Sequence, residues 1–99
     1  MKKEDVQKIQ EVVRNVTRFA REHRTKIYIT KLSNGNLVYD IGLEGIGTGT
    51  IDSLVNFDIS DIYQVLQEER MQKKSIDYEI RIRKHWKYDA NCICIYQWK

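Results

Sequence analysis

Apolar residues recur at steps of three and four along the first quarter of the chain, which is the spacing of an amphipathic helix. The stripe consists of Val6, Ile9, Val13, Val16 and Ala20. Acidic residues stand at its start and arginines at its end, as the helix dipole favours. The pattern predicts a helix from about Glu4 to His23, with His23 packed at the helix end.

A second helix is predicted around position 65. Its inward-facing side would carry Ile59, Ile62, Val65 and Leu66. Asp58 or Ser60 is the expected N-cap, because a short polar side chain can accept a hydrogen bond from a free N–H group of the first turn. The helix is expected to end near Lys74.

Much of the remaining chain alternates between apolar and polar residues, which is the period of a half-buried strand. We expect strands at about 26–32, 37–43, 76–83 and 92–98. Glycines interrupt the pattern at 42–49, and an irregular or bulged strand is expected at about 46–57. Asn34-Gly35 predicts a type I′ hairpin turn between the first two strands, since both residues accept positive φ angles.

These elements predict one α+β domain over residues 1–99, with two helices packed on an antiparallel sheet of four to five strands in the order α-β-β-(β)-α-β-β. The residues expected in the sheet, many of them facing the helices, are Ile27, Ile29, Leu37, Tyr39, Ile80, Ile82, Ile93 and Ile95. The last strand also carries Cys92, Cys94, Tyr96 and Trp98 on its other side. Apolar residues on both faces predict a central strand or one covered by a partner.

Composition adds little to this prediction. The chain has 99 residues, of which 41% are hydrophobic and 31% charged, as in an ordinary globular domain. No run approaches the roughly 20 apolar residues of a membrane span. Met1 to Asp5 lead directly into the amphipathic stretch, so we expect no signal peptide, no membrane and a place in the cytoplasm.

Charge is divided into three blocks along the chain. Residues 1–31 hold nine Lys and Arg against four acids, residues 32–69 hold seven acids and no base, and residues 70–99 hold eight bases against three acids. Such segregation predicts electropositive and electronegative faces, unless the blocks neutralise one another once the chain is folded.

No motif for catalysis or cofactor binding is present. The segment 45–50 is rich in glycine, but Ile51-Asp52 stands where a phosphate loop needs Lys and Ser or Thr, so a bulged strand is the better interpretation. The ligand spacing of a zinc site is matched only weakly by Cys92, Cys94, His85 and His23. The two cysteines are expected to be buried and unbridged, because their Cβ atoms would point the same way from one strand. We expect no enzyme, no cofactor and no metal.

Two basic surfaces are candidates for partner binding. On the first helix, Arg14, Arg18 and Arg21 fall within about 60° of one another, opposite the apolar stripe. They could hold phosphates or an acidic partner, or they could simply form a solvated helix face.

The second surface follows the fourth predicted strand, where cations alternate with rings: Arg81, Arg83, Lys84, Trp86, Lys87 and Tyr88. Bases stack on rings while cations meet phosphates, so this hairpin is also the best nucleic-acid signal in the chain. The alternative is that Trp86 and Tyr88 close the edge of the core. A third candidate is a carboxylate surface made by Asp52, Asp58, Asp61, Glu68 and Glu69.

In its size, its lack of proline, its richness in Lys, Ile and Tyr and its segregated charge, the chain resembles the short accessory proteins of phages and mobile elements. These include anti-CRISPR and other anti-defence inhibitors. The resemblance implies a non-enzymatic monomer or homodimer that occludes a host protein, such as a nucleic-acid-binding or defence complex, through a charged surface. The alternative is a small nucleic-acid-binding domain that uses the hairpin at 81–88 and the arginines of the first helix.

Overall fold

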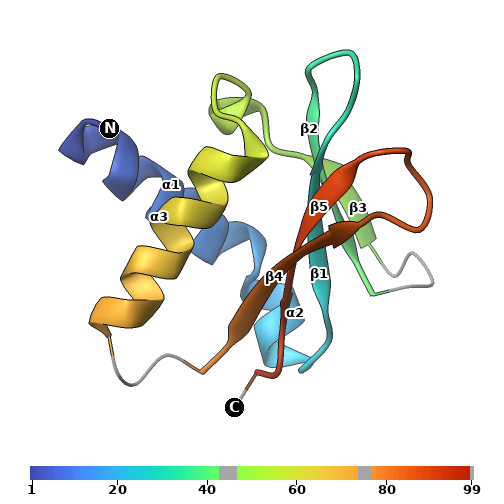
Figure 1. Ribbon diagram of the computed structural model, residues 1–99. Coiled ribbons are helices and arrows are strands. Elements are labelled where there is room, and N and C mark those ends of the chain that lie inside the picture. The colour runs from blue at the N-terminus through green and yellow to red at the C-terminus, as the bar shows by residue number, and fades with distance from the viewer. Residues whose placement is uncertain (43–46, 74–76, 99) are drawn as a thin grey trace.

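The computed structural model describes residues 1–42, 47–73 and 77–98 (Figure 1). It confirms the α+β class. The predicted positions Leu43, Gly45, Ile46, Lys74 and Ile76 lie outside the described residues. In chain order the elements are α1 (Lys3–Val16), α2 (Arg18–Glu22), β1 (Ile27–Lys31), β2 (Leu37–Ile41), β3 (Gly47–Thr50), the 3-10 turn η1 (Asp52–Leu54), α3 (Ile59–Gln72), β4 (Glu79–Lys84) and β5 (Asn91–Tyr96).

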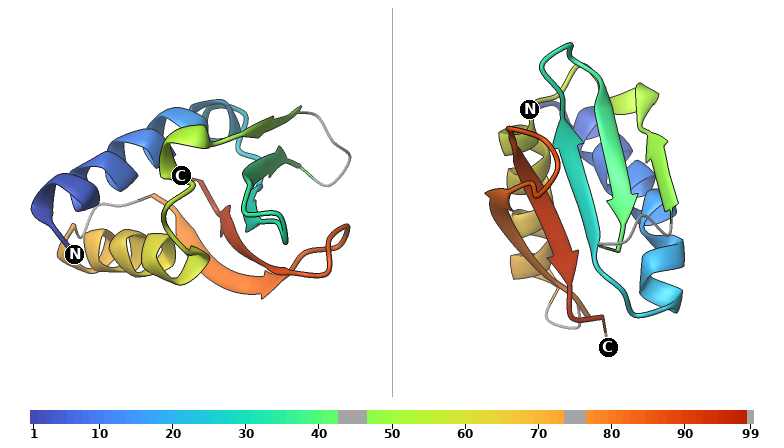
Figure 2. Two further views of the ribbon diagram at one scale, coloured as in Figure 1. Left: turned by 90° about the horizontal axis from the view of Figure 1, so that it is seen from above. Right: turned by 90° about the vertical axis from the view of Figure 1, so that its right-hand side faces the viewer.

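The five strands form one antiparallel sheet in the order β3-β2-β1-β5-β4. α1 and α3 lie side by side on one face of this sheet, and none of the described helices lies on the opposite face (Figure 2). We call these the helix face and the outer face. β5 lies between β1 and β4, which confirms the central place predicted from its two apolar sides.

The first helix is broken rather than continuous, so the single helix predicted to His23 is wrong in this detail. The buried hydroxyl of Thr17 donates a hydrogen bond to the carbonyl of Val13 at 2.7 Å. Such back-bonding bends a helix, and here α1 ends at Val16. The prediction that His23 packs at the helix end also fails, because His23 is exposed and stacks on the ring of Phe19 at the surface of α2.

The hairpin between β1 and β2 forms where it was predicted, but with another turn. The N–H of Gly35 donates to the carbonyl of Leu32 at 2.9 Å, and Leu32 N–H donates to Asn36 at 2.8 Å. A type I′ turn needs positive φ at both central residues, whereas Gly35 (φ 91°) has it and Asn34 does not. The loop is therefore a three-residue turn in which glycine takes the left-handed position.

The glycine-rich segment contributes a strand that is shorter than predicted. β3 ends at Thr50, and η1 follows, so residues 52–57 are not extended in one strand. Gly49 lies opposite Tyr39 in the register, and a Cβ atom built on it would lie 2.6 Å from the Tyr39 hydroxyl. The absent side chain of Gly49 thus makes room for the ring of Tyr39, which is a packing reason for glycine here.

α3 begins at the predicted N-cap. The N–H of Asp58 donates to Asp61 Oδ2 at 3.2 Å in a reciprocal capping box. The ammonium of Lys31, at the end of β1, donates to the carbonyls of Val55 and Phe57 at 2.9 and 3.1 Å. These contacts satisfy two carbonyl groups of the segment between η1 and α3 and join this segment to β1. The helix that follows packs on the sheet, with the buried side chains Ile62, Val65 and Leu66 facing inward.

The core lies between the helices and the helix face. Its fully buried sheet residues are Ile27, Ile29, Leu37, Ile93 and Ile95, all as predicted. Two predictions need correction. Ile82 is 40% exposed, because β4 is an edge strand. Trp98 packs against Tyr78 on the helix face, because Gln97 takes a positive φ of 59° and reverses the alternation.

None of the described helices is both long enough and apolar enough to cross a lipid bilayer.

Two isoleucines that face each other across β4 and β5 test this description of the core. Ile93 is fully buried, whereas its register partner Ile82 is largely accessible. We expect Ile93→Ala to lower the free energy of unfolding by about 2–5 kcal/mol, and Ile82→Ala by less than about 1 kcal/mol. Urea denaturation measures both. Equal losses would contradict the assignment of β4 to the sheet edge.

Candidate functional site

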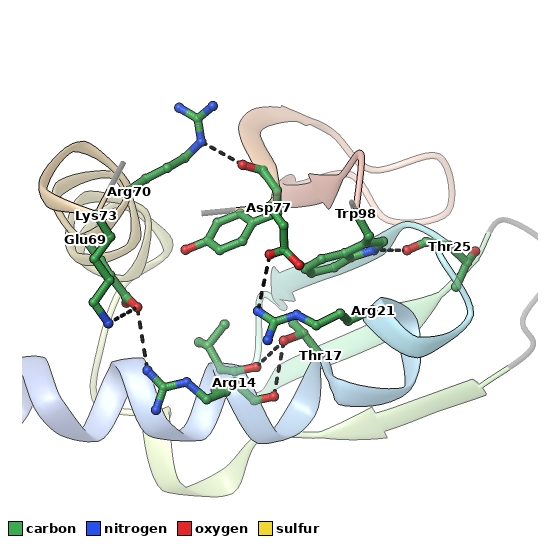
Figure 3. Close-up of polar contacts among 11 residues, drawn as sticks. Arg14, Thr17, Arg21, Thr25, Glu69, Arg70, Lys73, Asp77 and Trp98 are labelled. Carbon is green, nitrogen blue, oxygen red and sulfur yellow. Dashed lines mark hydrogen bonds and ion pairs between the residues drawn. The ribbon is translucent and has the colours of Figure 1, made fainter. Parts of the chain in front are cut away.

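Two of the three predicted arginines on α1 and α2 form ion pairs within the chain. Arg14 Nη2 lies 3.6 Å from a carboxylate oxygen of Glu69 on α3, and Arg21 Nη2 lies 3.9 Å from Asp77 (Figure 3). The guanidinium of Arg21 also covers the ring of Trp98 at 5.4 Å. The prediction that all three arginines lie opposite the core is therefore wrong for Arg14 and Arg21, because both flank the buried stripe and face α3 and the end of the sheet.

Around these arginines a polar cluster joins the beginning and end of the chain. Arg70 donates to the carbonyl of Tyr78 at 2.8 Å, and the indole N–H of Trp98 donates to the carbonyl of Thr25 (Figure 3). A cavity of about 20 Å³ lies among them, room for about one water. Burial, and then the nearby carboxylate of Glu69, raises the pKa of Tyr78 to about 12. The cavity is too small for a ligand larger than a water molecule.

The predicted acidic surface is also largely used by the fold. Asp58 and Asp61 cap α3, and Glu69, whose side chain is 11% exposed, pairs with Lys73 as well as Arg14. Asp52 and Glu68 are exposed but belong to separate elements, η1 and α3. Four of the five carboxylates thus lie on α3 or at its N-cap, and three of these cap the helix or form ion pairs within the chain.

The centre of the outer face is buried although no helix of the described residues covers it. Tyr28, Thr30, Cys92 and Cys94 are each at most 2% exposed. The loop between β4 and β5 folds back over these residues, and its Trp86 ring meets Tyr28 edge-on with centroids 4.4 Å apart. The chain thus covers this face with its own β4–β5 loop. This agrees with the apolar residues on the outer side of β5, which indicate a covered strand.

A buried hydrogen bond holds this loop in place. His85 Nε2 lies 2.9 Å from Asp40 Oδ2, and both side chains are 5% exposed or less. The other ring nitrogen, Nδ1, accepts the backbone N–H groups of Lys87 and Tyr88 at 2.9 and 3.2 Å. Nδ1 therefore carries no proton, and Nε2–H donates to the Asp40 carboxylate.

An aspartate–histidine pair is also found in the catalytic triad of hydrolases, but the geometry of Asp40 and His85 does not suit a general base. A general base needs a ring nitrogen that can reach the substrate. Here one nitrogen is bound to Asp40, and the other is occupied by two backbone donors. Among the residues that the structure describes, no three His, Cys, Asp or Glu side chains are placed to share a metal. The pair is positioned to support the loop.

The predicted hairpin residues come together on and beside the outer face. Arg81 lies over the ring of Tyr96 at 4.7 Å and donates to its hydroxyl at 2.8 Å. Arg83 is exposed, and no carboxylate among the described residues pairs with it. Trp86 is 45% exposed, and the ammonium of Lys87 lies 5.5 Å from the Tyr88 ring. The remaining cation of the set, Lys84, is paired with Asp89 at 2.9 Å.

Two further residues extend this set, and sequence patterns alone did not indicate them. Tyr96 accepts a hydrogen bond from Arg81, and the charge of Lys26 acts on Cys94 by opposing the rise in its pKa, which indicates that Lys26 lies toward the outer face. We call Lys26, Arg81, Arg83, Trp86, Lys87 and Tyr96 the hairpin surface. Lys26 could have been found from alternation, because it precedes Tyr28 by two residues and so shares its side of the strand.

The cysteines lie beneath this surface as buried thiols. Burial raises the pKa of Cys92 to about 11. Burial also raises the pKa of Cys94, against the opposing charges of Lys26, Arg83 and Arg81. Raised pKa values leave few reactive thiolates at neutral pH, so both side chains behave as small apolar groups.

The comparison with known proteins adds no assignment. The chain matches no protein-family model, no curated protein and no solved structure. The case for function rests on the geometry of the hairpin surface and on the chemistry of its side chains.

The contact between Asp40 and His85 can be tested by a double-mutant cycle with Asp40→Ala and His85→Ala. A hydrogen bond to a charged group contributes about 1.5–3 kcal/mol, so we expect a coupling energy in that range from urea denaturation. Each single variant leaves the other polar group buried and unpaired. Losses that simply add in the double variant would show that the two side chains act independently.

Proposed function

We propose that this chain is a non-catalytic binding protein that engages an acidic surface of a partner protein through the hairpin surface. The observation that carries the proposal is the different use of the arginines. Arg14 and Arg21 are bound to carboxylates of the chain itself, whereas Arg83 stays exposed without such a partner among the described residues. An unpaired guanidinium beside half-exposed rings is typical of the centre of a protein interface.

The rings of the hairpin surface favour a protein over a nucleic acid as partner. A base stacks on the open face of an aromatic ring. The ring of Trp86 already lies parallel to His85, with centroids 3.9 Å apart, and Arg81 covers Tyr96. One face of each ring is occupied by the chain itself, which limits a base to the other face, whereas apolar side chains of a protein can pack against that face or against the ring edge.

The kind of partner follows from the resemblance to phage and mobile-element inhibitors. We propose that the chain occludes a host protein, one-to-one, at an acidic site. A rigid hairpin surface suits this role, because side chains that are already ordered lose little conformational entropy on binding. Trp86 is braced by Tyr28 and His85, and Arg81 by Tyr96, before any partner arrives.

Nucleic-acid binding is the second candidate, and one observation favours it. Lys26, Arg81, Arg83 and Lys87 bring four cations to one side of the sheet, where phosphates could meet them. The two candidates differ in their response to salt. Binding to duplex DNA loses about 0.9 units of log affinity per tenfold rise in salt for each neutralised phosphate, whereas a protein interface with an apolar centre weakens less.

The proposal is tested with Arg83→Glu and a matched control, Arg18→Glu. Both arginines are exposed, and Arg18 contacts Asn15 on the helix layer instead. Each change alters net charge equally and should leave the free energy of unfolding within about 0.5 kcal/mol of the parent. In capture from nuclease-treated bacterial lysate, we expect Arg83→Glu to lose the partner protein and Arg18→Glu to retain it.

Two results would count against this function. Retention of the same partner by Arg83→Glu would show that the hairpin surface is merely solvated. Loss of all binding after nuclease treatment, with a steep salt dependence, would assign the surface to nucleic acid instead.

A further inference from the structure

β4 is a sheet edge with two chemically different sides. β4 is the last strand in the sheet order and pairs with β5 on one side. On its other side it has no strand partner among the described residues (Figure 2). Arg81 and Arg83 project on the outer face, and Ile80 and Ile82 on the helix face. Such an edge presents unpaired backbone N–H and C=O groups to any extended chain beside it.

Next to this edge, a groove of about 510 Å³ opens between α3 and β4. It is mostly apolar, and it is lined by Ile59, Tyr63, Gln64, Gln67, Ile82 and Asn91 among others. The 40% exposure of Ile82 arises here, since its side chain faces the groove and not the closed core. A strand placed beside β4 would direct every second side chain into this groove.

Pairing of β4 with a second copy of itself brings like charges together in some registers. In an antiparallel pair of β4 strands centred on Ile82, Arg81 would face Arg83 of the other copy. Centred on Arg81, the two Arg81 residues would face each other. Like charges directly opposite destabilise a strand pair. Opposite charges meet only in registers that place Glu79 against Arg81 or Arg83, so self-pairing is restricted in register, whereas a strand with acids opposite both arginines makes no like-charge contact there.

We propose that β4 accepts an extended segment of the partner protein as a sixth strand, with acidic residues and apolar residues at alternate positions. The acidic side chains lie beside Arg81 and Arg83, and the apolar ones enter the groove beside Ile82. This inference rests on the proposed function and gives it a binding mode: main-chain hydrogen bonds supply affinity, and alternate side chains supply specificity.

The length and charge of such a segment follow from β4. The strand has six residues, so about five to seven residues of the partner pair with it. Arg83 is the principal charge contact, since Arg81 also donates to Tyr96. A single exposed carboxylate contact contributes little alone, and the pairing depends on the combination of edge, groove and charge.

The test uses fluorescein-labelled nine-residue peptides and anisotropy. The probe alternates Glu with Val and Ile. One control has the same composition with its acids grouped at one end, and a second has Lys in place of Glu. We expect the alternating acidic peptide to bind at least tenfold more tightly than either control. We expect the Arg83→Glu variant to bind this peptide with at least tenfold lower affinity than the parent chain. Arg18→Glu, the matched protein control, binds as the parent does.

Amide hydrogen exchange shows where the peptide binds. Strand addition protects the amides of alternate β4 residues, namely those directed away from β5. Ile82→Ser makes the groove side of β4 polar and leaves the backbone and the arginines unchanged. We expect this variant to bind the alternating peptide more weakly than the parent chain.

Four outcomes overturn the inference. They are equal binding of the alternating and grouped acidic peptides, binding that leaves the β4 amides unprotected, preference for a single-stranded DNA oligomer, and self-association of the chain through β4. If Arg83→Glu loses the lysate partner but that partner leaves the β4 amides unprotected, strand addition is wrong and the proposed function stands. If Arg83→Glu retains the partner, the proposed function itself fails.

Discussion

The hydrogen bond from His85 to Asp40 determines how the outer face of the sheet is closed. Two helices cover only one side of five strands, and the side chains opposite them are nevertheless buried. The β4–β5 loop closes that side, and a loop is mobile unless its polar groups find partners. His85 meets this need twice, since it donates to Asp40 and accepts from Lys87 and Tyr88.

The candidate function follows from the same bond. Because His85 is fixed, Trp86 can stack on its ring and meet Tyr28 edge-on, which positions the exposed part of the loop beside Arg83. The helix arginines contribute to stability instead, by joining α1 and α2 to α3 and to the residues before β4. The basic residues of the sequence thus divide into Arg14 and Arg21, which pair with carboxylates of the chain at the margin of the core, and an exposed set at the hairpin.

Regular elements could be predicted from the sequence because hydrophobic periodicity is local. The strands that carry Ile27 and Ile93, and the capped helix after Asp58, needed nothing more. Errors occurred where tertiary geometry decides the outcome. Alternation alone does not indicate that Asp40 is buried and pairs with a histidine 45 residues away. Arg14 looked free, because its helix gives no indication of where α3 places Glu69.

Residue-resolved hydrogen exchange of the amides of Lys87 and Tyr88 tests the central claim most directly. Both amides lie in a surface loop and donate to the ring of His85. If the Asp40–His85 bond holds the loop, they exchange slowly in the parent chain, and they exchange fast in Asp40→Ala while the amides that join β1 to β5 stay protected. Fast exchange of Lys87 and Tyr88 in the parent chain would contradict the account, because the hairpin surface would then have no fixed shape.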